Sequence, residues 1–524
     1  MPKSSSNAQA PDELPPVEPV AAIRRLPATA NLENLKNQAK SLLKSLRAGH
    51  PDAASRFQKS HPQYADLTIA QILATPVKLA HAQLVIAREY GFLTWPRLKK
   101  HVESLTPIPK ETVERFRQAV QSGDAGILRH LLADEPRARE LVNDPIFSFD
   151  SPAIVAVAGR GNKDVLDVLL DAGADPNGRS TWWAGSFGAL DSTDPETSDY
   201  LVARGATLDI HAAARLGRLD RVRELVAADP DLVNARGGDG MTPLHFASTV
   251  PVCEFLLDHG AGIDITDFDH NGTPAQTAIK DREKLRYLVD RGATADIFIA
   301  CALGDLDLTR RILDADPDAL SLRIGKPPYT APGDHIYVYT IGYTARPIAL
   351  AQANGHAELV EFLFERSSDK DRLLYACAQG DRATAEAIVK RKPKLVASLT
   401  AEDQALLADC AWLNKLDAVQ LMLDLGFDIN VASVHNSTPL DRAALRGFAG
   451  IVRLLLERGA SRDVHNEFGG TPFRACLWGS ENWHDGLGDY VACVEAFLDA
   501  GEPVPEKAWG SPAVVALLRE RGAV

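Results

Sequence analysis

The chain has 524 residues, of which 45% are hydrophobic, and a formal net charge of −13. That length exceeds what one compact domain usually holds, and the apolar content is ample for an extended buried core. The negative charge disfavours general binding to DNA, RNA or anionic membranes, because each needs clustered positive charge on the protein.

The chain begins with residues 1–22, which are rich in serine, proline and acidic residues and contain no apolar run. We expect a disordered tail there and no signal peptide. A membrane-spanning helix needs about 20 consecutive apolar residues, and the sequence has no such stretch. We therefore expect a cytoplasmic protein without a membrane segment.

Residues 23–104 predict a small helical domain. Leucines at helical spacing over residues 32–46 indicate one helix, and apolar residues over 79–92 indicate another. Residues 24–59 contain eight Lys or Arg residues and two acidic ones, so this domain is locally basic. A solvated helix face is the favoured interpretation, whereas RNA binding would show a steep loss of affinity with added salt.

The clearest repeated unit lies between residues 435 and 501. Thr438 can cap a helix that begins at Pro439, since a proline in that position loses no hydrogen bond. Gly447 permits the chain to reverse, and Gly459 supplies a left-handed residue that ends a second, apolar helix. One such hairpin cannot bury its apolar faces alone and needs stacked neighbours.

This unit recurs with a period near 33 residues, since Thr438-Pro439 is followed by Thr471-Pro472. Residues 240–247 contain the tetrapeptide Thr-Pro-Leu-His. These features resemble ankyrin repeats. The resemblance implies an all-α solenoid of about 12 helical hairpins over residues 110–524, and protein binding through the concave surface. Residues 83–102 are similar to an N-terminal segment found on uncharacterised bacterial ankyrin proteins.

Two insertions, residues 321–347 and 478–490, interrupt the repeats, and loops commonly hold function on a repeat scaffold. The alternation between Ile336 and Thr340 predicts an extended hairpin. Tyrosine and tryptophan in loops are typical of binding hot spots, although such rings can also pack back onto the array. The candidate partner-binding residues are Trp182, Trp183, Tyr337, Tyr339 and Trp483.

Sequence patterns that suggest a catalytic or metal-binding site are weak. Asp267 begins a segment like a calcium-binding loop, but Ala278 stands where that loop needs a glutamate. His484, with Asp485 and Asp489, offers a second hypothesis, a metal or small-molecule site near the 478–490 insertion. Six cysteines occur singly, without a CxxC pair, and we interpret them as reduced core residues. They are Cys253, Cys301, Cys377, Cys410, Cys476 and Cys493.

The sequence therefore predicts a monomeric scaffold or adaptor that binds a protein partner through its concave surface and loop insertions. We expect no catalytic residue, no metal ligand and no cofactor. DNA, RNA and membranes are not expected as partners.

Overall fold

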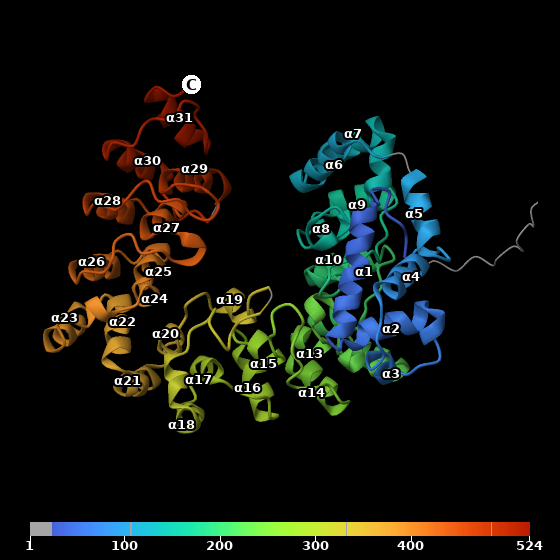
Figure 1. The fold of residues 1–524 in the computed structure, drawn as a ribbon, viewed down its shortest axis with the longest axis horizontal. Coiled ribbons are helices and arrows are strands. Elements are labelled where there is room, and N and C mark those ends of the chain that lie inside the picture. The colour runs from blue at the N-terminus through green and yellow to red at the C-terminus, as the bar shows by residue number, and fades with distance from the viewer. Residues whose placement is uncertain (1–23, 105–106, 332, 484) are drawn as a thin grey trace, which may run out of the picture. The chain divides into compact units, whose positions relative to one another are not determined.

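The computed structural model describes residues 24–104, 107–331, 333–483 and 485–524 (Figure 1). The predicted tail of residues 1–22 lies outside this range. Over the described residues the structure is helical, with two isolated β-bridges and no β-strand. No helix in the described ranges combines the length and apolar character that crossing a bilayer requires.

The chain packs as two compact units. The first contains residues up to Thr294 together with Ala331–Ile336, and the second contains Ala295–Thr330 and Tyr337–Val524. The α-helices up to Thr294 are α1 (Leu32–Arg47), α2 (Pro51–Ser60), α3 (Ile69–Leu73), α4 (Leu79–Glu89), α5 (Trp95–Ser104), α6 (Lys110–Ser122), α7 (Ala125–Asp134), α8 (Ala153–Ala158), α9 (Lys163–Asp171), α10 (Pro195–Val202), α11 (Ile210–Arg215), α12 (Leu219–Ala228), α13 (Pro243–Phe246), α14 (Val250–Asp258), α15 (Pro274–Thr277) and α16 (Arg282–Asp290).

The remaining α-helices lie after Thr294. They are α17 (Ile297–Leu303), α18 (Leu306–Ala315), α19 (Ile336–Thr340), α20 (Pro347–Ala353), α21 (Ala357–Arg366), α22 (Asp369–Gln379), α23 (Arg382–Arg391), α24 (Ala401–Gln404), α25 (Leu406–Trp412), α26 (Leu416–Asp424), α27 (Pro439–Leu445), α28 (Ala449–Glu457), α29 (Pro472–Asn482), α30 (Tyr490–Asp499) and α31 (Pro512–Glu520).

Helices α1 to α5 share one apolar core, in which Phe57 and Tyr64 are fully buried. This helical segment is joined to the repeats of the same unit through Asp144, which is 2% exposed. The Asp144 carboxylate accepts hydrogen bonds from the amides of Ala28 and Thr29, at 2.9 and 2.7 Å. Part of the local positive charge is neutralised internally, because Arg24 and Arg56 both pair with Glu89.

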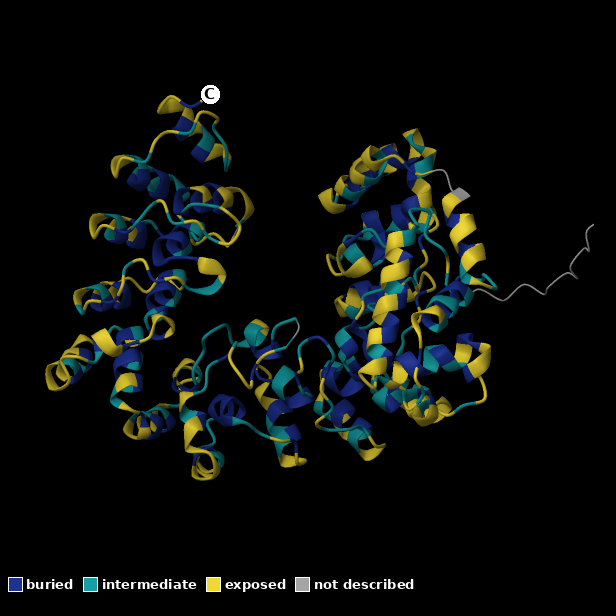
Figure 2. Cartoon of the chain, viewed as in Figure 1, coloured by how far each residue is buried: buried dark blue, intermediate teal, exposed yellow. Residues whose placement is uncertain are grey.

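The hairpin from Thr438 to Gly459 forms as the sequence predicts. The Thr438 hydroxyl accepts the Asp441 amide at 3.2 Å, and α27 begins at Pro439. Gly447 and Gly459 both adopt positive φ, at 71° and 82°. Figure 2 shows burial concentrated where neighbouring helices meet, as stacked repeats require. All six cysteines are buried and unpaired.

The insertion at residues 321–347 differs from its predicted form. Ile336–Thr340 is the short helix α19 and not part of an extended hairpin. The Tyr337 ring is fully buried against Phe298, and its hydroxyl donates to Asp296 at 2.9 Å. Packing onto the first turn of α17 therefore decides the local structure, and a five-residue alternation is too short to override it.

Candidate protein-binding surface

Three consecutive repeats of the second unit bring two tryptophans and two arginines together. Trp412 ends α25, Arg446 follows α27, and Trp483 follows α29. The rings of Trp412 and Trp483 meet edge to face with centroids 5.3 Å apart. Arg446 lies over both rings, at 4.8 and 5.1 Å, and Arg442 of α27 lies over Trp412 at 4.7 Å. We call these four residues the Trp–Arg cluster.

Carboxylates balance the charge of both arginines. Arg446 pairs with Asp485 at 2.6 Å, and Arg442 pairs with Asp409 at 3.3 Å. Asp485 also accepts the Trp483 indole N–H at 2.9 Å. The Leu487 amide, together with the Trp483 indole and Arg446, holds the pKa of Asp485 below its usual range. One carboxylate thus fixes the loop that follows α29.

Close backbone contacts set the position of this loop. A Cβ atom on Gly479, inside α29, would lie 2.2 Å from the Leu445 carbonyl oxygen. A Cβ atom on Gly488 would lie 2.4 Å from the Arg446 carbonyl oxygen. Real Cβ atoms do not come so near to backbone oxygen, so both positions need glycine. The two glycines allow α29 and its loop to approach α27 closely enough for Trp483 to reach Arg446.

Large apolar side chains in α29 and in the segments that follow α25 and α29 are exposed to solvent. Leu413, next to Trp412, is 59% exposed, Trp478 of α29 is 48% exposed, and Leu487 is 67% exposed. Tryptophan and arginine are the residue types most enriched in interface hot spots. The combination of an ordered Trp–Arg cluster and exposed apolar neighbours is therefore typical of a protein-binding surface.

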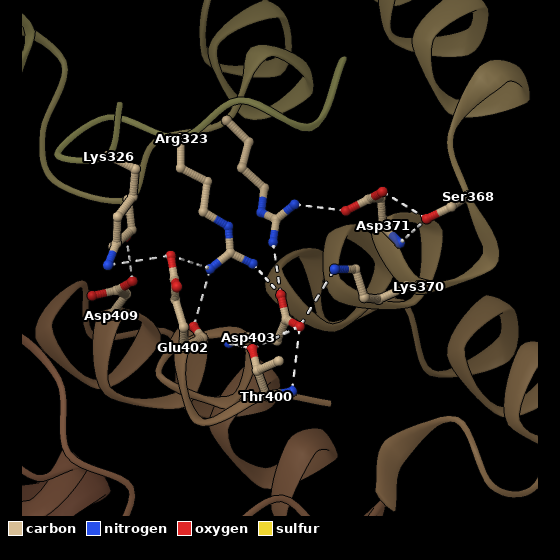
Figure 3. Close-up of polar contacts among 11 residues, drawn as sticks. Arg323, Lys326, Ser368, Lys370, Asp371, Thr400, Glu402, Asp403 and Asp409 are labelled. Atoms are coloured by element: carbon tan, nitrogen blue, oxygen red, sulfur yellow. Dashed lines mark hydrogen bonds and ion pairs between the residues drawn. The ribbon is translucent and has the colours of Figure 1, made fainter. Parts of the chain in front are cut away.

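A second set of charged residues holds the 321–347 insertion on the repeats (Figure 3). Arg323 and Arg346 of the insertion both pair with Asp403, which is 4% exposed, and Lys370 joins them at 3.4 Å. Arg346 also pairs with Asp371 at 2.7 Å. We call these five residues the insertion clamp. Burial by itself would raise the pKa of Asp403, but the hydrogen bond and charge of Arg323 lower it.

The five sequence-predicted binding residues are divided between the two units, and they differ in burial. Tyr337 is fully buried, so it cannot contact a partner in this structure, which corrects that prediction. Tyr339, on the same helix, is 59% exposed. Trp182 and Trp183 lie in the first unit, where Trp182 packs edge to face on Phe149. Trp483 belongs to the Trp–Arg cluster.

Sequence reasoning missed Trp412, Arg442 and Arg446. The usable signal was positional, since Trp412, Arg446 and Trp483 each stand at the end of the first helix of a hairpin. Stacking of successive repeats brings equivalent positions side by side.

The structure gives little support to a metal or small-molecule site at the 478–490 insertion. Asp485 is engaged by Arg446 and Trp483, and Asp489 caps α30 by accepting the Ala492 amide at 3.0 Å. His484, named with them in the second hypothesis, lies outside the described residues.

Comparison with known proteins identifies the repeats. A family model for ankyrin repeats in three copies matches residues 210–299, and a model for a single ankyrin repeat matches residues 435–467. The chain therefore contains ankyrin repeats, and its fold class is an all-α ankyrin-repeat solenoid.

Three curated proteins illustrate the similarity. The mouse ankyrin repeat and SAM domain-containing protein 6 is 29% identical over 119 residues, which is 22% of this chain and 14% of that protein. The Arabidopsis thaliana E3 ubiquitin-protein ligase KEG is 24% identical over 326 residues, 51% of this chain and 20% of the ligase. The Schizosaccharomyces pombe palmitoyltransferase akr1 is 38% identical over 65 residues, 12% of this chain and 10% of the transferase. The chain thus spans a fifth or less of each relative.

Proposed function

We propose that this chain is a scaffold or adaptor that binds a protein partner through the Trp–Arg cluster of its second unit. The observation that carries the proposal is the placement of Trp412, Arg446 and Trp483 on three successive repeats, with exposed apolar residues within five positions of the two tryptophans in sequence. The ankyrin repeats support a role in protein–protein interaction.

The physical advantage of this surface is its order before binding. Arg446 is held by Asp485 and by two aromatic rings, so little side-chain entropy is lost when a partner covers it. A partner with an aromatic or aliphatic side chain and a nearby acidic group suits the cluster, since it adds apolar contact and a second carboxylate for the arginines.

The proposal extends to the rest of the chain. It assigns the chain a binding role without a catalysed reaction. It also assigns a monomeric state and a cytoplasmic location, and it excludes DNA, RNA and membranes as partners. It also treats residues 23–104 as a separate helical domain of the kind attached to bacterial ankyrin proteins. Their shared apolar core and the hydrogen bonds to Asp144 support an N-terminal cap on the repeats.

The test is affinity capture from lysate of the source organism with the intact chain and with single variants. Trp412→Ala and Trp483→Ala each remove one ring of the cluster, and Trp183→Ala removes a half-exposed tryptophan of the first unit as the matched control. The proposal expects one protein to be retained by the intact chain and by the control. Retention should fall at least about 10-fold for both cluster variants, the size of a modest hot spot. Equal loss in all three variants would contradict it.

A further inference from the structure

Two neighbouring turns of the first unit place an imidazole against two carboxylates. Asp239 lies three residues before Thr242, and His270 lies three residues before Thr273, so they occupy the same position in successive repeats. Stacking of the repeats brings the two turns together, and the Asp239 carbonyl accepts the amide of Phe268 at 2.8 Å. Asp269 adds the second carboxylate from the same turn as His270.

The separations between these groups are those of ion pairs, but they are longer than a direct charge-assisted hydrogen bond. His270 Nε2 lies 3.6 Å from Asp239 Oδ2 and 3.8 Å from Asp269 Oδ2, and the three ligand atoms lie within 4.8 Å of one another. A charge-assisted N–H···O contact is about 2.7–2.9 Å long. Ligands around a tetrahedral ion with bonds of about 2.0–2.1 Å are about 3.3 Å apart. The observed spacing is therefore closer to that of ligands that share an ion.

The second ring nitrogen of His270, Nδ1, is hydrogen-bonded to backbone carbonyls, as is common for metal-binding histidines. Nδ1 lies 3.1 Å from the Gly333 carbonyl and 3.0 Å from the Asp334 carbonyl. A carbonyl can only accept, so Nδ1 carries the hydrogen and Nε2 is directed at the carboxylates. Metal-binding histidines are oriented by this kind of hydrogen bond to a backbone carbonyl. A Cβ atom on Gly333 would lie 2.3 Å from Asp269 Oδ1, so a side chain there would displace that carboxylate.

The carboxylates are largely removed from water. The side chain of Asp239 is 16% exposed and that of Asp269 is 8% exposed. Asp239 Oδ1 is buried and has no hydrogen-bond partner among the described residues. An unpartnered buried carboxylate oxygen is unfavourable, and a bound cation would offset that cost.

We propose that Asp239, Asp269 and His270 bind a divalent transition-metal ion of the Zn²⁺ class. Nε2 of His270 and one oxygen of each carboxylate supply three ligands, and water takes a fourth position. The imidazole favours Zn²⁺ and its neighbours in the first transition series over Ca²⁺ and Mg²⁺, which prefer sites made of oxygen alone. The ion would link two repeats, and the carbonyls of Gly333 and Asp334 would orient its histidine.

A matched control exists within the chain. His435 stands three residues before Thr438, at the same turn position as His270 and Asp239, and like Asp239 it has positive φ, at 60°. It faces Glu467, and the two side chains are about half exposed. His435 does not belong to any group of three or more metal-ligating side chains in the described part of the chain. His435→Gln therefore removes an equivalent histidine without touching the proposed site.

The experiment is calorimetric titration of the full chain with ZnCl₂ after chelator treatment and desalting. We expect one saturable Zn²⁺ site in the native chain and in His435→Gln. Affinity should fall at least about 10-fold in His270→Gln and in Asp239→Asn. Asn suits position 239 well because φ there is 54°, a conformation that asparagine tolerates. CaCl₂ and MgCl₂ should give at least about 10-fold weaker binding in the same titration.

Absence of saturable Zn²⁺ binding to the native chain would overturn the proposal, and the three side chains would then form an ion pair only. Unchanged affinity in folded Asp239→Asn and His270→Gln would overturn it equally. Circular dichroism shows whether each variant is folded. If His270→Gln does not fold, Asp239→Asn decides the question by itself.

Discussion

Lowering the pH should open the repeat that contains His245, because this buried imidazole is held neutral. The Thr242 amide donates to Nδ1 at 3.0 Å, and Nε2 donates to the Gly272 carbonyl at 3.0 Å. Both nitrogens are thus used in one tautomer, and a proton on Nδ1 would break the first bond. Burial, assisted by the nearby charge of Lys284, lowers the pKa of His245 to about 3.

The direction of this pH effect follows from the difference in proton binding between the open and closed forms of the repeat. When the repeat is open, His245 is exposed to water and binds a proton below its ordinary pKa of 6.5. When the repeat is closed, the buried imidazole remains neutral until about pH 3. The contribution of His245 to the stability of the closed repeat is therefore present above pH 6.5. It is lost progressively as the pH falls towards 3. At pH 5 the loss amounts to about 2 kcal/mol, or about 30-fold in the opening equilibrium.

Hydrogen exchange followed by mass spectrometry measures this opening locally, in peptides covering α13 and α14. After correction for intrinsic exchange rates, protection there should drop about 30-fold between pH 7 and pH 5 in the native chain. His245→Gln lowers protection at both pH values but should remove most of the pH dependence. If the variant keeps the full dependence, His245 is not the responsible group and the argument fails. His435→Gln should behave like the native chain.

Three further predictions concern the second unit. Gly479→Ala should lower the free energy of unfolding by about 1–3 kcal/mol through overpacking against Leu445. Gly450→Ala, in α28 with its nearest atom 4.0 Å away, should be neutral or stabilising by up to about 1 kcal/mol, and chemical denaturation compares the two. Asp403→Asn should lower the free energy of unfolding by about 3 kcal/mol, because Arg323 and Arg346 lose their shared buried carboxylate and keep only Glu402 and Asp371; proteolysis within residues 321–347 should be faster, and unchanged cleavage would contradict this. Asp485→Ala should weaken partner binding while leaving the free energy of unfolding almost unchanged, because that ion pair is partly exposed.

The repeat fold could be predicted from local chemistry. Thr438, Pro439 and Gly459 act within one hairpin, so their capping and left-handed roles depend on neighbouring residues alone. The Tyr337 segment could not be predicted in this way. Its structure depends on Phe298 and Asp296, about 40 residues earlier, which supply the packing and the hydrogen bond.

The sites were harder to predict for the same reason. Trp483 was found by residue type, but its partners Trp412 and Arg446 come from preceding repeats. Asp239 and His270 are likewise one repeat apart in sequence and adjacent in space. A sequence expectation of no metal ligand considered residues close together in the chain. Comparison of equivalent positions in successive repeats is the sequence signal that could have found both groups.

Site-specific photocrosslinking tests the central claim most directly, which is that the surface beside the Trp–Arg cluster binds a protein. A benzophenone amino acid replaces Leu487, which is 67% exposed, and in a matched chain it replaces Ile127 of the first unit, which is 53% exposed. Irradiation in lysate of the source organism should give one discrete protein adduct from position 487 and none from position 127. The adduct should disappear when Trp412→Ala is added. A discrete adduct from position 127 alone, or an adduct at 487 that persists in Trp412→Ala, would contradict the account.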